Sequence, residues 1–142
     1  MDLNENSLDS ASERIRHIEP RRLVANVLEP LPSNAGPYDS IGVNYLFHCV
    51  PGSWAEKGEA FGHLADRLDD RGVLFGATIL GDGAAHNLGG RSLMALYNRL
   101  GIFHNRENDA EPLRDELLSR FDDVSLDVVG TVAVFSARRP RR

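Results

Sequence analysis

The sequence predicts an α/β fold: a doubly wound, mostly parallel sheet with an antiparallel strand pair at its C-terminal edge. Stretches typical of strands and of helices alternate along the 142 residues. The run YDSIGVNYLFHCVPG at 38–52 is apolar on both faces at its centre, as in a strand covered by helices on each side. Two β-rich stretches then close the chain around Gly130.

The first third of the chain supplies one helix, one short strand and a loop. Apolar residues repeat at helical spacing and predict a helix near residues 6–18, which Asn4 or Asn6 could cap. Residues 22–27 form an apolar stretch that predicts a short strand. The proline-rich segment 29–37 cannot pair in a sheet, so we expect a loop that leads into the strand at 38.

The middle of the chain continues the alternation. Ser53 and Glu56 have capping-box spacing and predict the start of a helix over about 54–69. Residues 72–80 are apolar and predict a second buried strand. A third helix is expected to end just before Gly101, because glycine is the preferred residue after a helix C-terminus.

The C-terminal part holds a fourth helix, behind Asp109, and the strand pair. Residues 124–129 and 131–137 are β-rich and predict antiparallel strands at a sheet edge. The expected organisation is one domain over 1–138, followed by a basic tail at 139–142 that is frayed and solvated.

Charge and cysteine content restrict the class of protein. A net charge of -5 argues against a surface built for nucleic acid or for an anionic membrane. Cys49 is the only cysteine, so no intrachain disulfide can form. No secretory h-region or membrane-length apolar run is present in the sequence, and we expect a soluble cytoplasmic protein.

Three segments carry a resemblance to a known family: residues 1–8, 25–31 and 38–52. With the elements in this order, the chain resembles the class I S-adenosylmethionine-dependent methyltransferases, in particular their small-molecule branch, over nearly its whole length. The resemblance implies a Rossmann-like methyltransferase fold, S-adenosyl-L-methionine as cofactor, and methyl transfer to a small-molecule acceptor. Whether oxygen, nitrogen or carbon is methylated stays open.

The resemblance also implies which residues bind the cofactor. Asp2, followed by Leu3, stands where the family binds the ribose, and a carboxylate can accept both hydroxyls of a vicinal diol. Asn26 and the backbone N–H of Val27 would face the adenine, although an aspartate is common at the position of Asn26. The strand and loop at 38–52 would lie beneath the methionine part, with Asn44 and Tyr45 in contact.

The acceptor side is expected to begin at His48. Its imidazole could take a proton from the acceptor, since the unperturbed pKa near 6.5 suits general-base catalysis; packing at the loop is the equal alternative. Methyltransferases of this branch often build the acceptor pocket around the third helix, which points to Asn87 and Tyr97. Trp54 is a further candidate for substrate contact, with a core position as the alternative.

The resemblance begins part-way into the family fold. In the family, a strand and a glycine-rich cofactor loop precede the ribose-binding acid by roughly 20 residues, whereas only Met1 precedes Asp2. Either the native protein starts further upstream, which the intact pattern at Asp2, Asn26 and Asn44 favours, or the chain is a non-catalytic subunit or remnant that binds a partner. We expect these residues alone to bind S-adenosylmethionine weakly or not at all.

Rival functions have weaker support in the sequence. Gly81-Asp82-Gly83 imitates a phosphate-binding loop, but His86 occupies the place of the third glycine of a dinucleotide fingerprint. The histidines and Cys49 show no metal-ligand spacing, and no Gly-x-Ser-x-Gly nucleophile motif is present, so we expect no metal. A small-molecule acceptor is the expected partner, with no nucleic acid or membrane, and homo-oligomer formation stays open.

Overall fold

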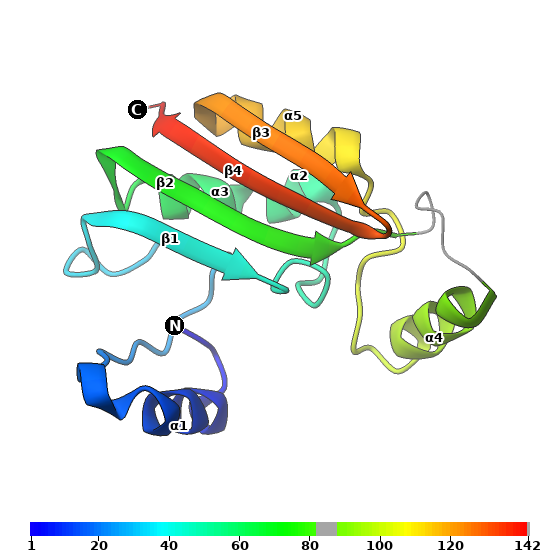
Figure 1. Ribbon diagram of the computed structural model, residues 1–142, viewed down its shortest axis with the longest axis horizontal. Coiled ribbons are helices and arrows are strands. Elements are labelled where there is room, and N and C mark those ends of the chain that lie inside the picture. Colours follow the sequence, from blue (N-terminus) through cyan, green and yellow to red (C-terminus); the bar gives the residue numbers. More distant parts are fainter. Residues whose placement is uncertain (82–87, 142) are drawn as a thin grey trace.

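The structure, a computed structural model, describes residues 1–81 and 88–141. Its centre is a four-stranded sheet with the order β1-β2-β4-β3 (Figure 1). The strands are β1 (Tyr38–Asn44), β2 (Leu68–Ile79), β3 (Phe121–Val129) and β4 (Val132–Pro140). The α/β class is confirmed, and β2 begins four residues before the predicted strand at 72.

Strand direction changes within the sheet. β1 and β2 run parallel, with Val43 opposite Gly76, whereas β4 is antiparallel to both β2 and β3. The antiparallel pair around Gly130 is confirmed; Gly130 has a φ of 62°, which suits the tight turn between β3 and β4. Because β4 inserts between β3 and β2, the described sheet is mixed, with one parallel pairing of three, rather than mostly parallel.

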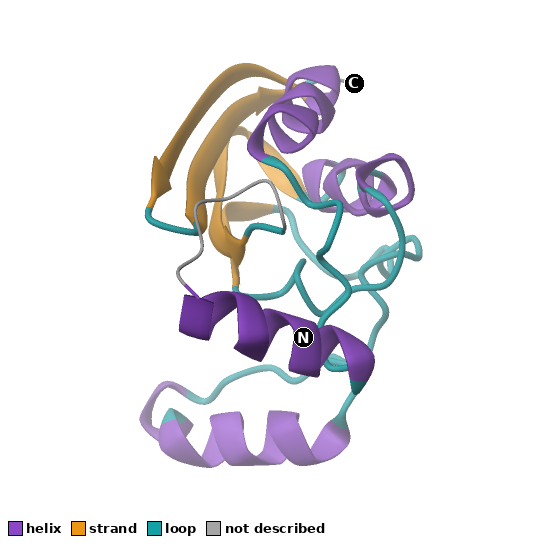
Figure 2. Cartoon of the chain, turned by 90° about the vertical axis from the view of Figure 1, so that its right-hand side faces the viewer, coloured by secondary structure: helices purple, strands orange, loops and turns teal. Residues whose placement is uncertain are grey.

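Helices cover one face of this sheet. Figures 1 and 2 both show α2 (Trp54–Lys57), α3 (Glu59–Ala65) and α5 (Ala110–Arg120) on the same side. No helix of the described ranges lies over the other face, where Phe75 and Val134 are 42% and 45% exposed. The second helical layer of a doubly wound fold is therefore not seen in this part of the chain. None of the described helices is long and apolar enough to span a bilayer.

The hydrophobic core lies between the covered face and these helices. Phe61 packs 4.7 Å from Phe47 and 6.1 Å from Phe135, measured between ring centroids. The predicted helix over 54–69 is divided at Gly58, because glycine costs about 1 kcal/mol in a helix interior. The capping box of Ser53 and Glu56 is present, and the Ser53 N–H donates to Glu56 Oε2 at 2.7 Å.

The N-terminal segment lies beyond the β1 side of the sheet (Figure 1). It holds α1 (Glu5–Arg14), capped by Asn4, and a 3₁₀ turn, η1 (Arg16–Ile18), so the helix predicted near 6–18 is confirmed with a tighter end. The strand predicted over 22–27 is wrong. Among the described residues it is reduced to a single parallel bridge between Asp2 and Val24, because only residue 2 lies alongside to pair with it.

The C-terminal elements follow the predicted order. α4 (Leu88–Arg99) ends before Gly101, whose φ is 68°, and α5 follows Asp109. The predicted tail is corrected: β4 continues to Pro140, and Arg141 donates from Nε to Asp122 Oδ1 at 2.8 Å. Residues 139–141 are therefore tied to the end of the sheet rather than frayed.

Candidate functional site

The N-terminal residues and the segment after the Asp2–Val24 bridge enclose a cavity of about 300 Å³. This is the lower end of the volume range, roughly 300–1,000 Å³, of small-molecule sites. The four residues predicted to hold ribose and adenine all line it: Asp2, Leu3, Asn26 and Val27. The rest of the wall is mainly apolar and includes Leu28, Leu46, Val50 and Pro51.

Backbone hydrogen bonds fix the polar groups of this cavity. The Asp2 N–H donates to the Leu23 carbonyl at 3.3 Å, and the Asp2 carbonyl accepts from the Ala25 N–H at 3.3 Å. Asp2 Oδ1 accepts from the Asn4 N–H at 2.9 Å. The second carboxylate oxygen has no hydrogen-bond partner among the described residues and can accept one from a ligand.

The segment from Asn26 to Glu29 forms a turn that contributes Asn26, Val27 and Leu28 to the same cavity. Asn26 Oδ1 accepts from the Leu28 N–H at 3.1 Å, and its Nδ2 donates to Glu29 Oε1 at 3.2 Å. Val27 is buried, and within the described ranges its N–H makes no hydrogen bond. A buried donor without a partner is a natural contact for a ring nitrogen, which is the role predicted for Val27.

A groove of about 460 Å³ follows the outer edge of β1 and is lined by Asn44 and Tyr45. It shares Met1, Asp2 and Leu46 with the first cavity, so the two hollows adjoin each other. The structure thus brings the predicted ribose, adenine and methionine contacts to one connected surface. The carboxylate oxygen of Asp2 and the N–H of Val27 that have no partner in the part of the chain that the structure describes suit the polar groups of a nucleoside ligand.

Tyr45 has an unusual backbone conformation at the end of β1. Its φ is 56°, in the left-handed region that bulky residues rarely adopt, and the residue is 55% exposed. The Tyr45 N–H is held by the Ala77 carbonyl at 2.7 Å. The ring is therefore presented to the groove by a strained residue, a feature that is concentrated at binding sites.

His48 lies behind Tyr45 and is 5% exposed. Its ring packs edge-on against Phe103, with centroids 4.7 Å apart, and against Tyr45 at 6.0 Å. Burial, and then the charge of Lys57, lower the pKa of His48 below its ordinary value. Its Nδ1 is buried and has no hydrogen-bond partner in the described part of the chain. A neutral imidazole with a free nitrogen can accept a proton.

The predicted acceptor residues have different surroundings. Tyr97 is half-buried and packs edge-on against Phe103 at 5.0 Å, which links it to His48. Trp54 is 3% exposed, and its Nε1 donates to the Asp109 carbonyl at 3.1 Å, which favours the core position over substrate contact. Asn87, like Asp82, Gly83 and His86, lies outside the described residues.

Two buried polar residues near His48, Lys57 and Asn108, were not predicted from the sequence. Lys57, Asn105 and Asn108 are buried to within 1% exposure. Asn105 Nδ2 donates to the carbonyls of Ile79 and Leu80, at the end of β2. The one signal in the sequence was Lys57, the only lysine among 16 basic residues.

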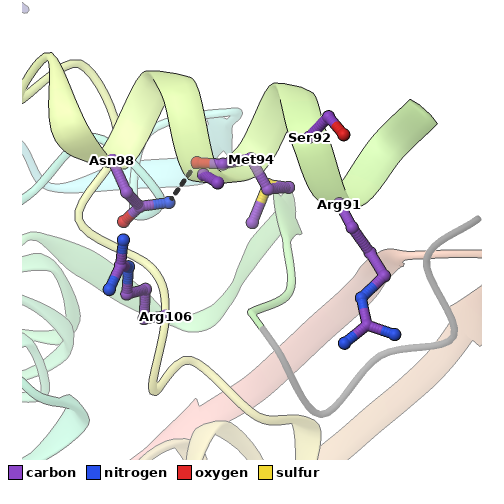
Figure 3. A pocket seen from close by; sticks show the side chains of 6 residues that line it. Arg91, Ser92, Met94, Asn98 and Arg106 are labelled. Atoms are coloured by element: carbon purple, nitrogen blue, oxygen red, sulfur yellow. Dashed lines mark hydrogen bonds between the residues drawn. The ribbon is translucent and has the colours of Figure 1, made fainter. Parts of the chain in front are cut away.

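A separate cavity of about 480 Å³ lies beside α4 (Figure 3). Two arginines, Arg91 and Arg106, reach toward it, and Asn98 on the same wall donates from Nδ2 to the Met94 carbonyl at 2.9 Å. None of the residues predicted to bind the cofactor lines it. Among the residues that the structure describes, no cluster of three or more His, Cys, Asp or Glu could hold a metal ion.

No protein-family model matches the chain. Among curated proteins, "Methyltransferase aurB" of Calcarisporium arbuscula is 40% identical over 141 residues, which are 99% of this chain and 61% of that protein. "Demethylluteothin O-methyltransferase" of Streptomyces thioluteus is 43% identical, over 96% of this chain and 60% of that protein. An "O-methyltransferase" of Aspergillus niger is 37% identical, over 100% of this chain and 77% of that protein.

Solved structures share the fold. An O-methyltransferase family protein from Burkholderia thailandensis superposes with a TM-score of 0.64 at 18% identity, over 97% of this chain and 42% of that one. The N-methyltransferase NodS from Bradyrhizobium japonicum, in complex with S-adenosyl-L-homocysteine, gives 0.63 at 15% identity, over 99% and 65%. The chain belongs to the class I S-adenosylmethionine-dependent methyltransferases, as the resemblance predicted. It spans about 60% of the length of the first two curated relatives.

Proposed function

We propose that this chain takes part in S-adenosylmethionine-dependent methyl transfer to a small-molecule acceptor. The observation that carries the proposal is the connected surface formed by the 300 Å³ cavity and the β1 groove, on which all six predicted cofactor residues meet. The relatives named as O- and N-methyltransferases support the reaction class, and leave the methylated atom open. The lone Cys49 supports a cytoplasmic location.

Different residues would contact different parts of the cofactor. The free oxygen of Asp2 would accept a ribose hydroxyl, Asn26 and the Val27 N–H would hold the adenine edge, and Leu28 and Leu46 would flank the ring. Asn44 and Tyr45 would contact the methionine end. When bound, S-adenosylmethionine supplies an activated methyl group on a sulfonium, to which the face of an aromatic ring is attracted.

The acceptor would approach from the side of His48, Phe103 and Tyr97. Holding a nucleophile in line with the methyl group supplies most of the acceleration in such a displacement. His48, neutral because burial disfavours its charged form, would accept the proton that the nucleophile loses. Replacing His48 with glutamine should then lower turnover of an ionisable acceptor, and unchanged turnover at every pH would exclude the base role.

Binding of S-adenosylhomocysteine tests the proposed cofactor site. We expect the ligand to shift the methyl NMR signals of Leu28, Leu46 and Val50, which line the cavity, and to leave Met94 and Ala95, which line the cavity beside α4, unchanged. Affinity should be weaker than low-micromolar for these 142 residues alone, since β1 is the edge of the described sheet. Calorimetry that gives a low-micromolar Kd would contradict this expectation.

Substitution of Asp2 tests its proposed contact with the ribose, by comparison with a control substitution outside the cavity. Asp2→Asn replaces the carboxylate that would accept the ribose hydroxyls, and we expect the Kd, measured from the same methyl shifts, to rise at least about tenfold, which corresponds to about 1.4 kcal/mol. Asp115→Asn, an exposed change on α5, is the control and should bind like the parent. Equal Kd values for the two variants would remove Asp2 from the site.

A further inference from the structure

The only lysine of the chain is also the most deeply buried basic residue that the structure describes. Lys57 is 0% exposed, whereas the other 15 basic residues are arginines. Its Nζ lies 5.6 Å from the centroid of the Trp54 ring. Within the described ranges no carboxylate lies at ion-pair distance from it. A buried ammonium without a counter-ion is unfavourable for stability, so a role other than stability is indicated.

Both hydrogen bonds of the Lys57 side chain go to one loop, Phe103–Asn108. Its Nζ donates to the His104 carbonyl at 2.7 Å and to Asn108 Oδ1 at 3.1 Å. The His104 N–H in turn donates to the His48 carbonyl at 2.7 Å. The loop is thus fastened to α2 through Lys57 and to the segment after β1 through His48.

The end of β2 holds the same loop from the other side. The Gly81 N–H donates to the Asn108 carbonyl at 2.9 Å. A Cβ on Gly81 would lie only 2.1 Å from the Asn105 carbonyl oxygen, so the two backbones are in close contact. The loop is therefore held near its start by the His104–His48 bond and at its end by the Gly81–Asn108 bond, and Lys57 bonds to it at both places.

We propose that Lys57 is a positioning residue for the acceptor side of the site: its ammonium group holds the loop Phe103–Asn108 against His48, so that acceptor, aromatic wall and base meet in a fixed geometry. The proposal rests on the proposed function. Phe103 is the link, because its ring contacts both His48 and Tyr97. Displacement of the loop would separate the aromatic wall from the imidazole.

The charge of Lys57 also favours the neutral, proton-accepting form of His48. A positive charge near His48 disfavours the imidazolium, and Lys57 contributes, after burial, to the lowered pKa of His48. The groups that face Lys57 are His48 and Cys49 after β1, Glu56 on α2, and the loop; from α5, Glu116 lies against Gly58. Burial lowers the pKa of Lys57 to about 8, while Cys49 and Glu56 oppose that shift.

Two NMR measurements on the whole chain, without cofactor, test the proposal. In Lys57→Met we expect the His104 amide to exchange at least tenfold faster, because the loop loses its anchor, and the His48 imidazole to titrate at a higher pH. Lys57→Gln keeps a donor for the His104 carbonyl but removes the charge. In that variant His104 should stay protected while the His48 titration still moves upward.

Arg67→Met is the matched control, because Arg67 donates to the Leu31 carbonyl at 2.8 Å and so anchors a different loop. It should leave both the His104 exchange and the His48 titration unchanged. Unchanged values in both Lys57 variants would overturn the proposal, as would the same shifts in Arg67→Met. Because neither readout needs cofactor, a failure to bind S-adenosylhomocysteine would count against the proposed function alone.

Discussion

Tyr45, at the end of β1, has a strained backbone and is exposed. A substitution at this position should therefore change the stability of the protein and its affinity for the cofactor in opposite directions. A left-handed conformation costs an L-residue about 1–2 kcal/mol, and glycine loses about 0.5–1 kcal/mol more entropy on folding. Tyr45→Gly should therefore raise the free energy of unfolding by about 0.5–1 kcal/mol in urea denaturation. It should also weaken binding of S-adenosylhomocysteine.

Tyr45→Phe is the control for that substitution, since it keeps both the strained backbone and the ring. It should leave the unfolding free energy near that of the parent. A Tyr45→Gly variant that is less stable, or that binds as well as the parent, would show that the tyrosine is held at this φ for packing alone.

The depressed pKa of His48 predicts a pH dependence of stability. Between the unfolded pKa near 6.5 and the lower folded value, the unfolded chain binds more protons than the native one, so stability falls as the pH falls. The contribution is fully present above about pH 6.5 and is lost as the pH drops through the folded pKa. Urea denaturation at several pH values from 7.5 to 4.5 should show a smaller loss for His48→Gln than for the parent.

His17→Gln provides a comparison, because His17 is an exposed histidine on η1. If His17→Gln and His48→Gln change the pH dependence equally, burial of His48 is not its source. A steeper loss in His48→Gln than in the parent would reverse the sign of the expected effect.

At the scale of elements, β1 shows which backbone groups of the sheet are unpaired. Among the described strands only β2 pairs with it, so its other edge has no partner strand. The Tyr45 N–H points to β2, where the Ala77 carbonyl accepts it. Successive amides of a strand point to opposite sides, so Ile41 and Val43 also face β2, whereas Gly42 and Asn44 face the outer edge.

Hydrogen exchange followed by NMR should resolve this alternation. We expect the amides of Ile41, Val43 and Tyr45 to exchange at least tenfold more slowly than those of Gly42 and Asn44. Equal protection of both sets in the 142-residue chain would mean that the outer edge is covered. Protection of Gly42 and Asn44 that appears only in an upstream-extended protein would support a strand added beside β1.

At the scale of the whole molecule, the order of the elements could be predicted because helical and strand periodicities differ along the chain. The uncovered sheet face could not: apolar side chains such as Phe75 and Val134 look the same in sequence whether or not a helix covers them. The position of β4 between β2 and β3 could not be predicted either, because the periodicity of a sequence carries no information on strand order. The strand predicted over 22–27 was wrong for a related reason, since a strand needs a partner of sufficient length.

The candidate site, like the fold, could be predicted from the sequence only in part. Asp2, Asn26 and Asn44 were predicted from short motifs at strand ends, and they line the two hollows on which the proposed cofactor site rests. Lys57 and Asn108 act through contacts between residues far apart in the chain, such as the hydrogen bond from Lys57 to Asn108. Spacing along one sequence does not reveal such contacts, so the support behind His48 emerged only from the fold.

The burial of Lys57 has a practical consequence for proteolysis. An endoproteinase that cleaves only after lysine has a single target in these 142 residues, and that target is 0% exposed. Cleavage then requires the region around α2 to open, and at low protease concentration its rate follows the population of the opened state. One cut, giving two fragments, would therefore report the opening equilibrium of the native chain without any label.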